Sequence, residues 1–310
     1  MKYLKLIRYQ NLLLLALMQL VFRFGFLKFQ NIFLSLADWQ YGLLVLSTVL
    51  IAAAGYIIND ILDQEVDNDN RPESKIIGTS ISEKAAYNLY FALNITGVAI
   101  GYYLANVIHK PSFAGAFIII SATLYMYATS LKQMLIIGNM IVALLLSFSV
   151  LIIGLFDLLP ATYDGNQTEM GILFSILIDY AVFAFIINFI REIVKDMEDI
   201  NGDYNQGMST LPIAFGLNKT SKIVAVLGII ATAILLWYIN VNLMNSRLYY
   251  AVIYGLLLIV APMIFFVVKI WSAKSKRDFH MLSTVLKWII FFGILSILVI
   301  TLNIKYNAKG

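Results

Sequence analysis

The feature that most constrains this sequence is a series of long apolar runs, the clearest of which extends from residue 41 to residue 58 without a charged side chain. A helix needs about 20 mainly apolar residues to cross roughly 30 Å of hydrocarbon. The mean hydropathy is +0.83. Hydrophobic residues make up 61% of the chain, whereas soluble domains contain about 45–50%. These observations exclude a soluble globular domain and predict an all-α, polytopic membrane protein.

The apolar runs predict a bundle of about nine transmembrane helices. They lie near residues 10–27, 41–58, 86–108, 112–130, 134–158, 171–190, 223–244, 249–270 and 286–304. The first run follows a basic stretch, as the apolar part of a signal peptide does, but no small-residue cleavage site comes after it. We therefore interpret this run as the first membrane helix.

The basic residues indicate how the bundle is oriented. With the amino terminus in the cytoplasm, 16 of the 22 Lys and Arg residues fall on the cytoplasmic side, in agreement with the positive-inside rule. The longest polar segments, about 59–85, 191–222 and 271–285, fall on that side too. We expect one transmembrane domain, residues 1–310, in the cytoplasmic (plasma) membrane. Because the basic residues are spread between apolar runs, the net charge of +4 indicates membrane topology and not a nucleic-acid partner.

Two acidic motifs, NDILDQEVD and KDMEDINGD, share one spacing. Their carboxylates are Asp60, Asp63 and Asp67 in the first motif and Asp196, Asp199 and Asp203 in the second. Positions i, i+3 and i+7 lie on one face of a helix. The motifs follow the second and the sixth predicted spans, so four crossings separate them and both emerge on the same side of the membrane. We therefore expect the two motifs to form one site.

Six carboxylates in one site repel one another unless a cation neutralises them. The chain has no Cys and only two His residues, so an all-oxygen site is expected, which is typical of a hard cation such as Mg²⁺. Mg²⁺ commonly joins carboxylates to phosphate oxygens, and this predicts a phosphate ester or a diphosphate as the ligand. Four basic residues are candidates for contact with such an anion: Arg71, Lys75, Lys132 and Lys195.

At this point the residues carry a family resemblance. NDILDQEVD is similar to the N-D-x-x-D-x-x-x-D motif of the UbiA superfamily of intramembrane prenyltransferases, and KDMEDINGD resembles its second aspartate motif. Two further segments that resemble this superfamily lie in the same order along the chain, RYQN (Arg8, Asn11) and YATSLKQMLIIGN (Tyr127, Lys132, Asn139).

Within the superfamily, residues 191–216 look most like the branch that contains digeranylgeranylglyceryl phosphate synthase, which makes archaeal-type ether lipids. That branch often continues its first motif as N-x-P-x-R-P, whereas this chain reads NRPESK. Ser74 stands where the arginine would be, and we expect Lys75 to supply the charge.

The resemblance implies a UbiA-like fold and Mg²⁺-dependent transfer of a prenyl group from an allylic prenyl diphosphate to a lipophilic acceptor among the membrane lipids. It implies that the six aspartates are catalytic residues and metal ligands, with Asn59 orienting the first three. It also implies substrate-binding roles for a set of polar residues near both motifs: Asn59, Arg8, Asn11, Arg71, Lys75, Tyr127, Lys132, Asn139 and Lys195.

The acceptor is the least constrained part of this interpretation. An isoprenoid glycerol phosphate needs cations beyond those that hold the diphosphate, and the polar end of the bundle has a surplus of them: Arg8, Arg71, Lys75, Lys132, Arg191, Lys195 and Lys219. We therefore expect ether-lipid synthesis. The alternative acceptor is aromatic, 4-hydroxybenzoate or dihydroxynaphthoate, for quinone synthesis. A membrane transporter is the alternative from another class, although its site is expected near the bilayer midplane.

Overall fold

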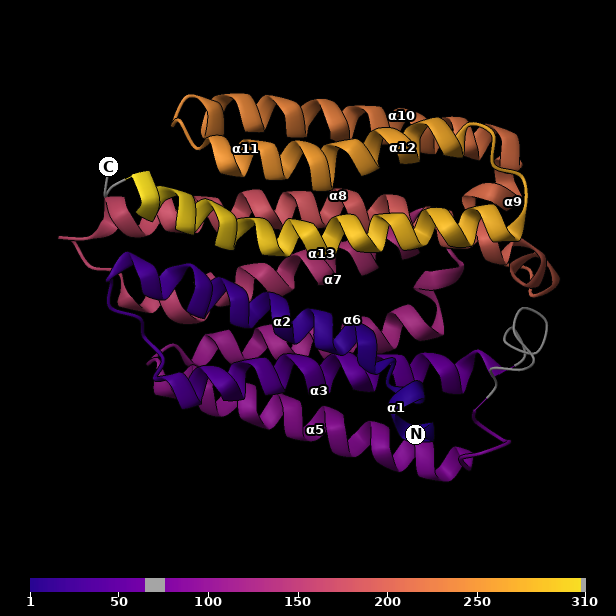
Figure 1. Ribbon diagram of the computed structural model, residues 1–310. Helices are drawn as coiled ribbons and strands as arrows, with labels where there is room; N and C mark the ends of the chain where they lie inside the picture. The colour runs from indigo at the N-terminus through magenta and orange to yellow at the C-terminus, as the bar shows by residue number, and fades with distance from the viewer. Residues whose placement is uncertain (65–75, 308–310) are drawn as a thin grey trace.

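The computed structural model describes residues 1–64 and 76–307, which form a bundle of long helices (Figure 1). The long helices are α2 (Tyr9–Gly25), α3 (Asp38–Leu62), α5 (Glu83–Val107), α6 (Ala114–Thr129), α7 (Ile137–Ile153), α8 (Gln167–Asn205), α10 (Leu217–Tyr238) and α13 (Lys276–Asn307), together with α11 (Tyr249–Gly255) and α12 (Ala261–Ile270), which follow one another. The short helices are α1 (Lys2–Leu6), α9 (Leu211–Phe215), η1 (Leu27–Gln30), η3 (Pro111–Phe113), η4 (Leu131–Gln133) and η6 (Leu159–Ala161). Three π-helical segments extend or join helices: η5 (Gly154–Leu158), η7 (Ile239–Met244) and η8 (Leu256–Val260).

Within the described part of the chain, eight helices are long and apolar enough to cross a membrane. Helix α5, with 25 residues, is the further long helix that the sequence predicts. The prediction of an all-α bundle of about nine membrane helices is therefore confirmed. Helices α8 and α13 contain 39 and 32 residues, more than the predicted spans 171–190 and 286–304, because their polar ends continue the helix beyond the apolar run.

Glycines let α5 approach its neighbours closely. A Cβ atom on Gly97 would lie 2.7 Å from the Ile51 side chain of α3, and one on Gly101 would lie 2.3 Å from the Phe117 ring of α6. The hydroxyl of Ser47 donates a hydrogen bond of 2.7 Å to the Gly97 carbonyl. Small residues spaced by four are a common device for packing helices in membranes. This contact fixes α5 to the outer side of α3.

The helices form three groups across the bundle (Figure 1). Helices α3, α5 and α6 lie on one side, α10, α11 and α12 on the other, and α2, α7, α8 and α13 between them. Successive long helices run in opposite directions, so the start of α2 and the ends of α3 and α8 lie at the same end of the bundle. We call this the site end, and the opposite one the far end.

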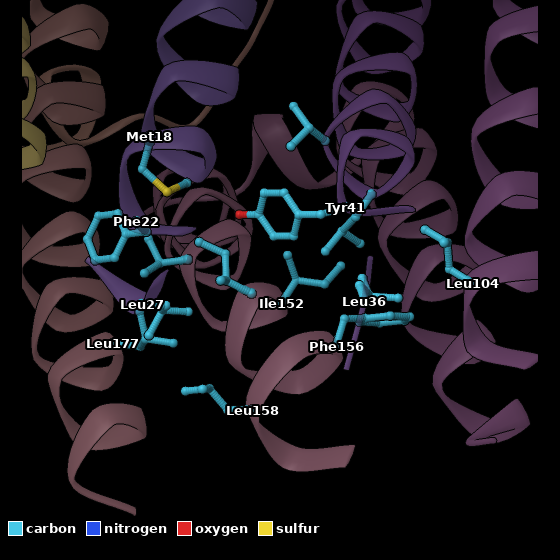
Figure 2. Close-up of a cluster of buried hydrophobic side chains, with 14 of the residues drawn as sticks. Met18, Phe22, Leu27, Leu36, Tyr41, Leu104, Ile152, Phe156, Leu158 and Leu177 are labelled. Carbon is cyan, nitrogen blue, oxygen red and sulfur yellow. The ribbon is translucent and has the colours of Figure 1, made fainter. Parts of the chain in front are cut away.

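The far end is closed by a packed apolar core. Side chains from α2, α3, α7 and α8 meet there, among them Phe22, Tyr41, Ile152 and Leu177 (Figure 2). The ring centroids of Phe117 and Phe156 lie 5.4 Å apart in an edge-on arrangement. Burial of these side chains stabilises the far end of the bundle. The polar residues of the two acidic motifs lie at the opposite end, the site end.

Candidate active site

The two acidic motifs end two helices at the site end of the bundle (Figure 1). The first motif lies at the end of α3, where Asp63 is the last described carboxylate of the motif. The second lies in the last three turns of α8, which stays helical through Asp203 and so keeps the predicted face. Asp67 lies outside the described residues, as do Arg71 and Lys75. The structure thus has both motifs on one side of the bundle, as the number of crossings predicts.

Basic and amide side chains hold the first motif. Arg8 contacts Asp60 at 2.9 Å, and its guanidinium lies 5.0 Å from the centre of the Tyr56 ring. The Asn59 amide donates a hydrogen bond of 2.7 Å to Asp63. Arg8 has a positive φ of 50°, a conformation that is uncommon for residues other than glycine. This backbone turn between α1 and α2 places the guanidinium over the end of α3.

The second motif is held from α7 and α13. Asn139 in α7 donates a hydrogen bond of 2.8 Å to Asp196, and the ammonium of Lys276 lies 3.9 Å from Asp199. The Asp203 side chain is buried. Buried carboxylates need partners to offset the loss of hydration. The motif is therefore a packed part of the bundle and not a solvated acidic surface.

The connector between α6 and α7, residues 130–136, joins the two motifs. Lys132 in η4 forms an ion pair with Asp63, while Asn139, one helical turn into α7, contacts Asp196. Gly138 makes this arrangement possible, because a Cβ atom there would lie 2.9 Å from the Cα of Lys132. The Ser209 amide beyond α8 also donates to the carbonyl of Gln133 in the connector, at 3.1 Å. One short segment thus fixes both acidic motifs.

A cavity of about 360 Å³ opens beside the motifs and runs into the bundle. Polar residues line its mouth: Arg8, Asn11, Tyr56, Asn59, Tyr127, Asn188, Arg191, Glu192 and Lys195. Asn11 donates to the Tyr56 hydroxyl at 3.3 Å, which joins α2 to α3 at this mouth. The deeper walls are mainly apolar and include Met18, Phe22, Leu124 and Phe148. The arrangement suits a molecule with a charged head and a long apolar tail.

The chemistry of these residues fits a hard cation. In the described ranges, no three His, Cys, Asp or Glu side chains lie close enough to hold one metal ion. The carboxylates are held instead by Arg8, Lys132 and Asn139. All the available donors are oxygens, and the buried Oδ1 of Asn59 has no hydrogen-bond partner. Oxygen donors of this kind suit Mg²⁺ bound together with an anion that supplies further oxygens.

The structure adds residues that the motif argument did not select. Glu192, four residues before Asp196, lies at the cavity mouth and accepts a hydrogen bond of 2.9 Å from Lys195. Extending the helical spacing of the second motif backward would have found it. Asp179 also lines the cavity, as does Tyr238. A carboxylate within the apolar run 171–190 is itself a signal, because such residues are rare in membrane spans.

Comparisons with known proteins agree with this geometry. The model of the UbiA prenyltransferase family matches residues 12–302. The chain is 32% identical, over 299 residues, to digeranylgeranylglyceryl phosphate synthase from Saccharolobus solfataricus, with 96% of this chain and 95% of the relative covered.

Two solved structures share the fold. One comes from work on the biosynthesis of digeranylgeranylglyceryl phosphate synthase in membranes and has a TM-score of 0.64 at 23% identity, covering 97% of each chain. The other is a UbiA homologue from Archaeoglobus fulgidus bound to DMAPP and Mg²⁺, with a TM-score of 0.58 at 18% identity, covering 96% of this chain and 99% of that one.

Proposed function

Because this chain belongs to the UbiA prenyltransferase family and is a prenyltransferase of the membrane, we propose that it transfers a prenyl group from an allylic prenyl diphosphate to an isoprenoid glycerol phosphate. One observation carries the proposal: Lys132 and Asn139 join the two aspartate motifs beside an apolar cavity, which the first motif reaches through Asn59. The name of the relative from S. solfataricus supports a glyceryl phosphate product.

The carboxylates of the two motifs would hold Mg²⁺, whose charge would stabilise the departing diphosphate. These are Asp60, Asp63 and Asp67 with Asp196, Asp199 and Asp203. A related structure bound to DMAPP and Mg²⁺ supports this requirement. Arg8 and Lys132, which contact Asp60 and Asp63, are placed to donate charge-assisted hydrogen bonds to the phosphate oxygens. Asn59 keeps Asp63 in position.

The reaction exchanges one carbon–oxygen bond for another. The bond between the first prenyl carbon and the diphosphate breaks, and the diphosphate leaves with the electron pair. The acceptor hydroxyl oxygen forms a bond to that carbon, and its proton passes to the departing diphosphate. The apolar cavity walls hold the prenyl tail and exclude water, which would otherwise capture the allylic cation. Tyr56 and Tyr127 line the mouth, where aromatic faces favour positive charge.

We place residues 1–310 as one transmembrane domain in the cytoplasmic membrane, with the site end facing the cytoplasm. The support is the charge distribution: basic residues gather at the site end, among them Lys2, Lys5 and Arg8 before α2 and Lys219 and Lys222 at the start of α10. Short cytoplasmic segments carry such an excess of Lys and Arg. A water-soluble diphosphate product would then leave into the cytoplasm.

The proposal is tested by the product of the purified protein. We expect protein in detergent, supplied with geranylgeranyl diphosphate, Mg²⁺ and an isoprenoid glycerol phosphate, to release diphosphate and to form an ether linkage that survives acid. Chelation of Mg²⁺ by EDTA should abolish both. Mass spectrometry identifies the product. A prenyl group on a ring carbon of 4-hydroxybenzoate or dihydroxynaphthoate, with no transfer to the glycerol phosphate, would establish the aromatic acceptor instead.

A further inference from the structure

A second cavity, of about 680 Å³, lies between α2, α8 and α13, beside the first one. Its walls are Gln10, Leu13, Leu14 and Leu17 from α2, Arg191, Lys195 and Glu198 from α8, and His280, Ser283, Thr284, Lys287, Trp288 and Phe291 from α13. Four of these residues also line the first cavity: Leu14, Arg191, Lys195 and Lys287. The two cavities are therefore neighbours that share a partition, and three of its four side chains are cationic.

The two α8 cations of the partition stand differently toward the second acidic motif. Arg191 and Lys195 are four residues apart, so their side chains are neighbours on the helix surface. Arg191 precedes Asp196 by five residues, which turns its side chain about 140° around the helix axis from that carboxylate. Lys195, four residues before Asp199, borders the motif, so Arg191 is the α8 cation of the partition that is turned away from the carboxylates.

The positive charge of the partition is only partly neutralised. Glu192 accepts from both Arg191, at 3.3 Å, and Lys195, at 2.9 Å. The Arg191 side chain is 18% exposed, and its Nε is buried without a hydrogen-bond partner. Among the described residues no carboxylate forms an ion pair with Lys287, which lines both cavities together with Arg191, a like charge. Glu198, on the outer wall, is contacted by His280 at 3.0 Å.

Cations partly withdrawn from water gain stability when an anion pairs with them. Arg191 and Lys287 come from different helices and converge on one space, which matches an anion with several acceptor oxygens. The same cavity also has apolar walls, formed by leucines of α2 and by Trp288 and Phe291 of α13. Leu13 and Trp288 are 62% and 55% exposed on the bundle surface that faces lipid. The occupant that fits both features is a phosphate monoester on a short polar group that carries a long apolar chain.

We propose that Arg191 and Lys287 form the subsite for the phosphate of the lipid acceptor, with the acceptor's chain lying between α2 and α13. This inference rests on the proposed function. It adds to the proposed function that the diphosphate of the prenyl donor and the phosphate of the acceptor bind at two separate sites. The diphosphate is held at the carboxylates of α3 and α8, and the acceptor phosphate is held at Arg191 and Lys287, to one side of the second acidic motif. The acceptor hydroxyl then reaches the mouth of the first cavity across the partition.

The test is a substitution at Lys287, because Lys287 has no carboxylate partner in the described chain and its loss leaves no buried anion unpaired. In Lys287→Met we expect the KM for an isoprenoid glycerol phosphate to rise about tenfold, the scale of one hydrogen bond to a charged group. The KM for geranylgeranyl diphosphate should stay within about twofold of wild type. Lys222→Met, an exposed lysine in the first turns of α10, serves as the matched control and should change neither value.

Two further acceptors separate the subsite from the proposed function. The dephosphorylated isoprenoid glycerol should be a poor acceptor for the wild-type protein. In Lys287→Met, the ratio of kcat/KM for the phosphorylated acceptor to kcat/KM for the dephosphorylated one should be smaller than in the wild type. Free glycerol phosphate, which lacks the chain, should compete only weakly. Equal use of both isoprenoid glycerols by the wild type would overturn the subsite. So would a Lys287→Met variant in which the KM for geranylgeranyl diphosphate rises as much as the KM for the isoprenoid glycerol phosphate. Neither result would contradict a glycerol acceptor. Transfer to an aromatic acid alone would instead overturn the proposed function.

Discussion

The two ends of the bundle both contain an arginine near carboxylates, but they use it differently. At the far end, Arg23 and Asp157 are 1% and 0% exposed and form an ion pair. The Leu36 amide donates to Asp157 at 3.1 Å, and the Arg23 guanidinium lies 4.5 Å from the centre of the Tyr41 ring. At the site end, Arg8 is 41% exposed in its contact with Asp60 and borders a cavity.

The difference shows what separates a structural charge from a functional one in this membrane protein. Arg23 and Asp157 line neither of the two cavities, and Leu36 and Tyr41, which contact Arg23, belong to the packed core of Figure 2. The charged groups at the site end are held by ion pairs and hydrogen bonds, and they lie beside a cavity that a substrate can enter. A charged pair buried away from both cavities therefore indicates a structural role, and a partly exposed pair at a cavity indicates binding.

The largest expected effect follows from breaking the far-end pair. Asp157→Asn removes the buried carboxylate and leaves Arg23 only its contact of 3.1 Å with the exposed Asp38, which costs about 3–5 kcal/mol of stability. Thermal unfolding in detergent should show a much lower midpoint. The double variant Arg23→Met, Asp157→Leu should recover most of the loss, because no unpaired charge is left. If Asp157→Asn unfolds at the wild-type temperature, the far end does not close the bundle as described.

At the site end, substitution of a motif carboxylate should affect turnover and leave the fold intact. Asp60→Asn or Asp196→Asn removes charge needed to hold the metal and the diphosphate. We expect kcat/KM to fall about 10²–10³-fold, which corresponds to about 2.7–4 kcal/mol. Diphosphate release measures this loss, and helical content checks the fold. Asp164→Asn, an exposed carboxylate in the loop before α8, is the matched control and should retain wild-type turnover.

A smaller effect is expected from the connector that joins the motifs. In Gly138→Ala the new Cβ would meet the Cα of Lys132 at 2.9 Å, so the backbone must shift and carry Lys132 or Asn139 with it. We expect turnover to fall about tenfold, equivalent to about 1.4 kcal/mol. Gly115→Ala in α6 meets nothing within 4 Å and should be neutral. Equal rates for the two variants would show that the connector does not position the site.

Much of the fold follows from the sequence because a membrane imposes it. Uncharged runs of about 20 residues have few alternatives to a spanning helix, and the number of crossings determines which loops share a side. The extension of α8 to Asn205 was less evident. It depends on polar residues that carry no apolar pattern, and their helix is supported by packing against neighbours such as Leu211 and Phe279.

The site was accessible from the sequence only where its residues lie close along the chain. The two motifs are local patterns, and their spacing is visible. The contacts that join them are not local: Lys132 and Asp63 are 69 residues apart, and Asn139 and Asp196 are 57 apart. The approach of Lys287 to Arg191 also depends on the packing of α13 against α8. Asp67, Arg71 and Lys75 lie outside the described residues, and their roles stay predictions.

The central claim is that the two aspartate motifs hold one diphosphate together, and a double-mutant cycle on substrate binding tests it most directly. Binding of geranylgeranyl diphosphate would be measured with Mg²⁺ for the wild type, Asp60→Asn, Asp196→Asn and the double variant. A shared site predicts strong non-additivity, with the double variant binding about as weakly as either single variant, and a coupling that disappears when EDTA removes the metal. Losses that simply multiply, with and without Mg²⁺, would contradict a shared site.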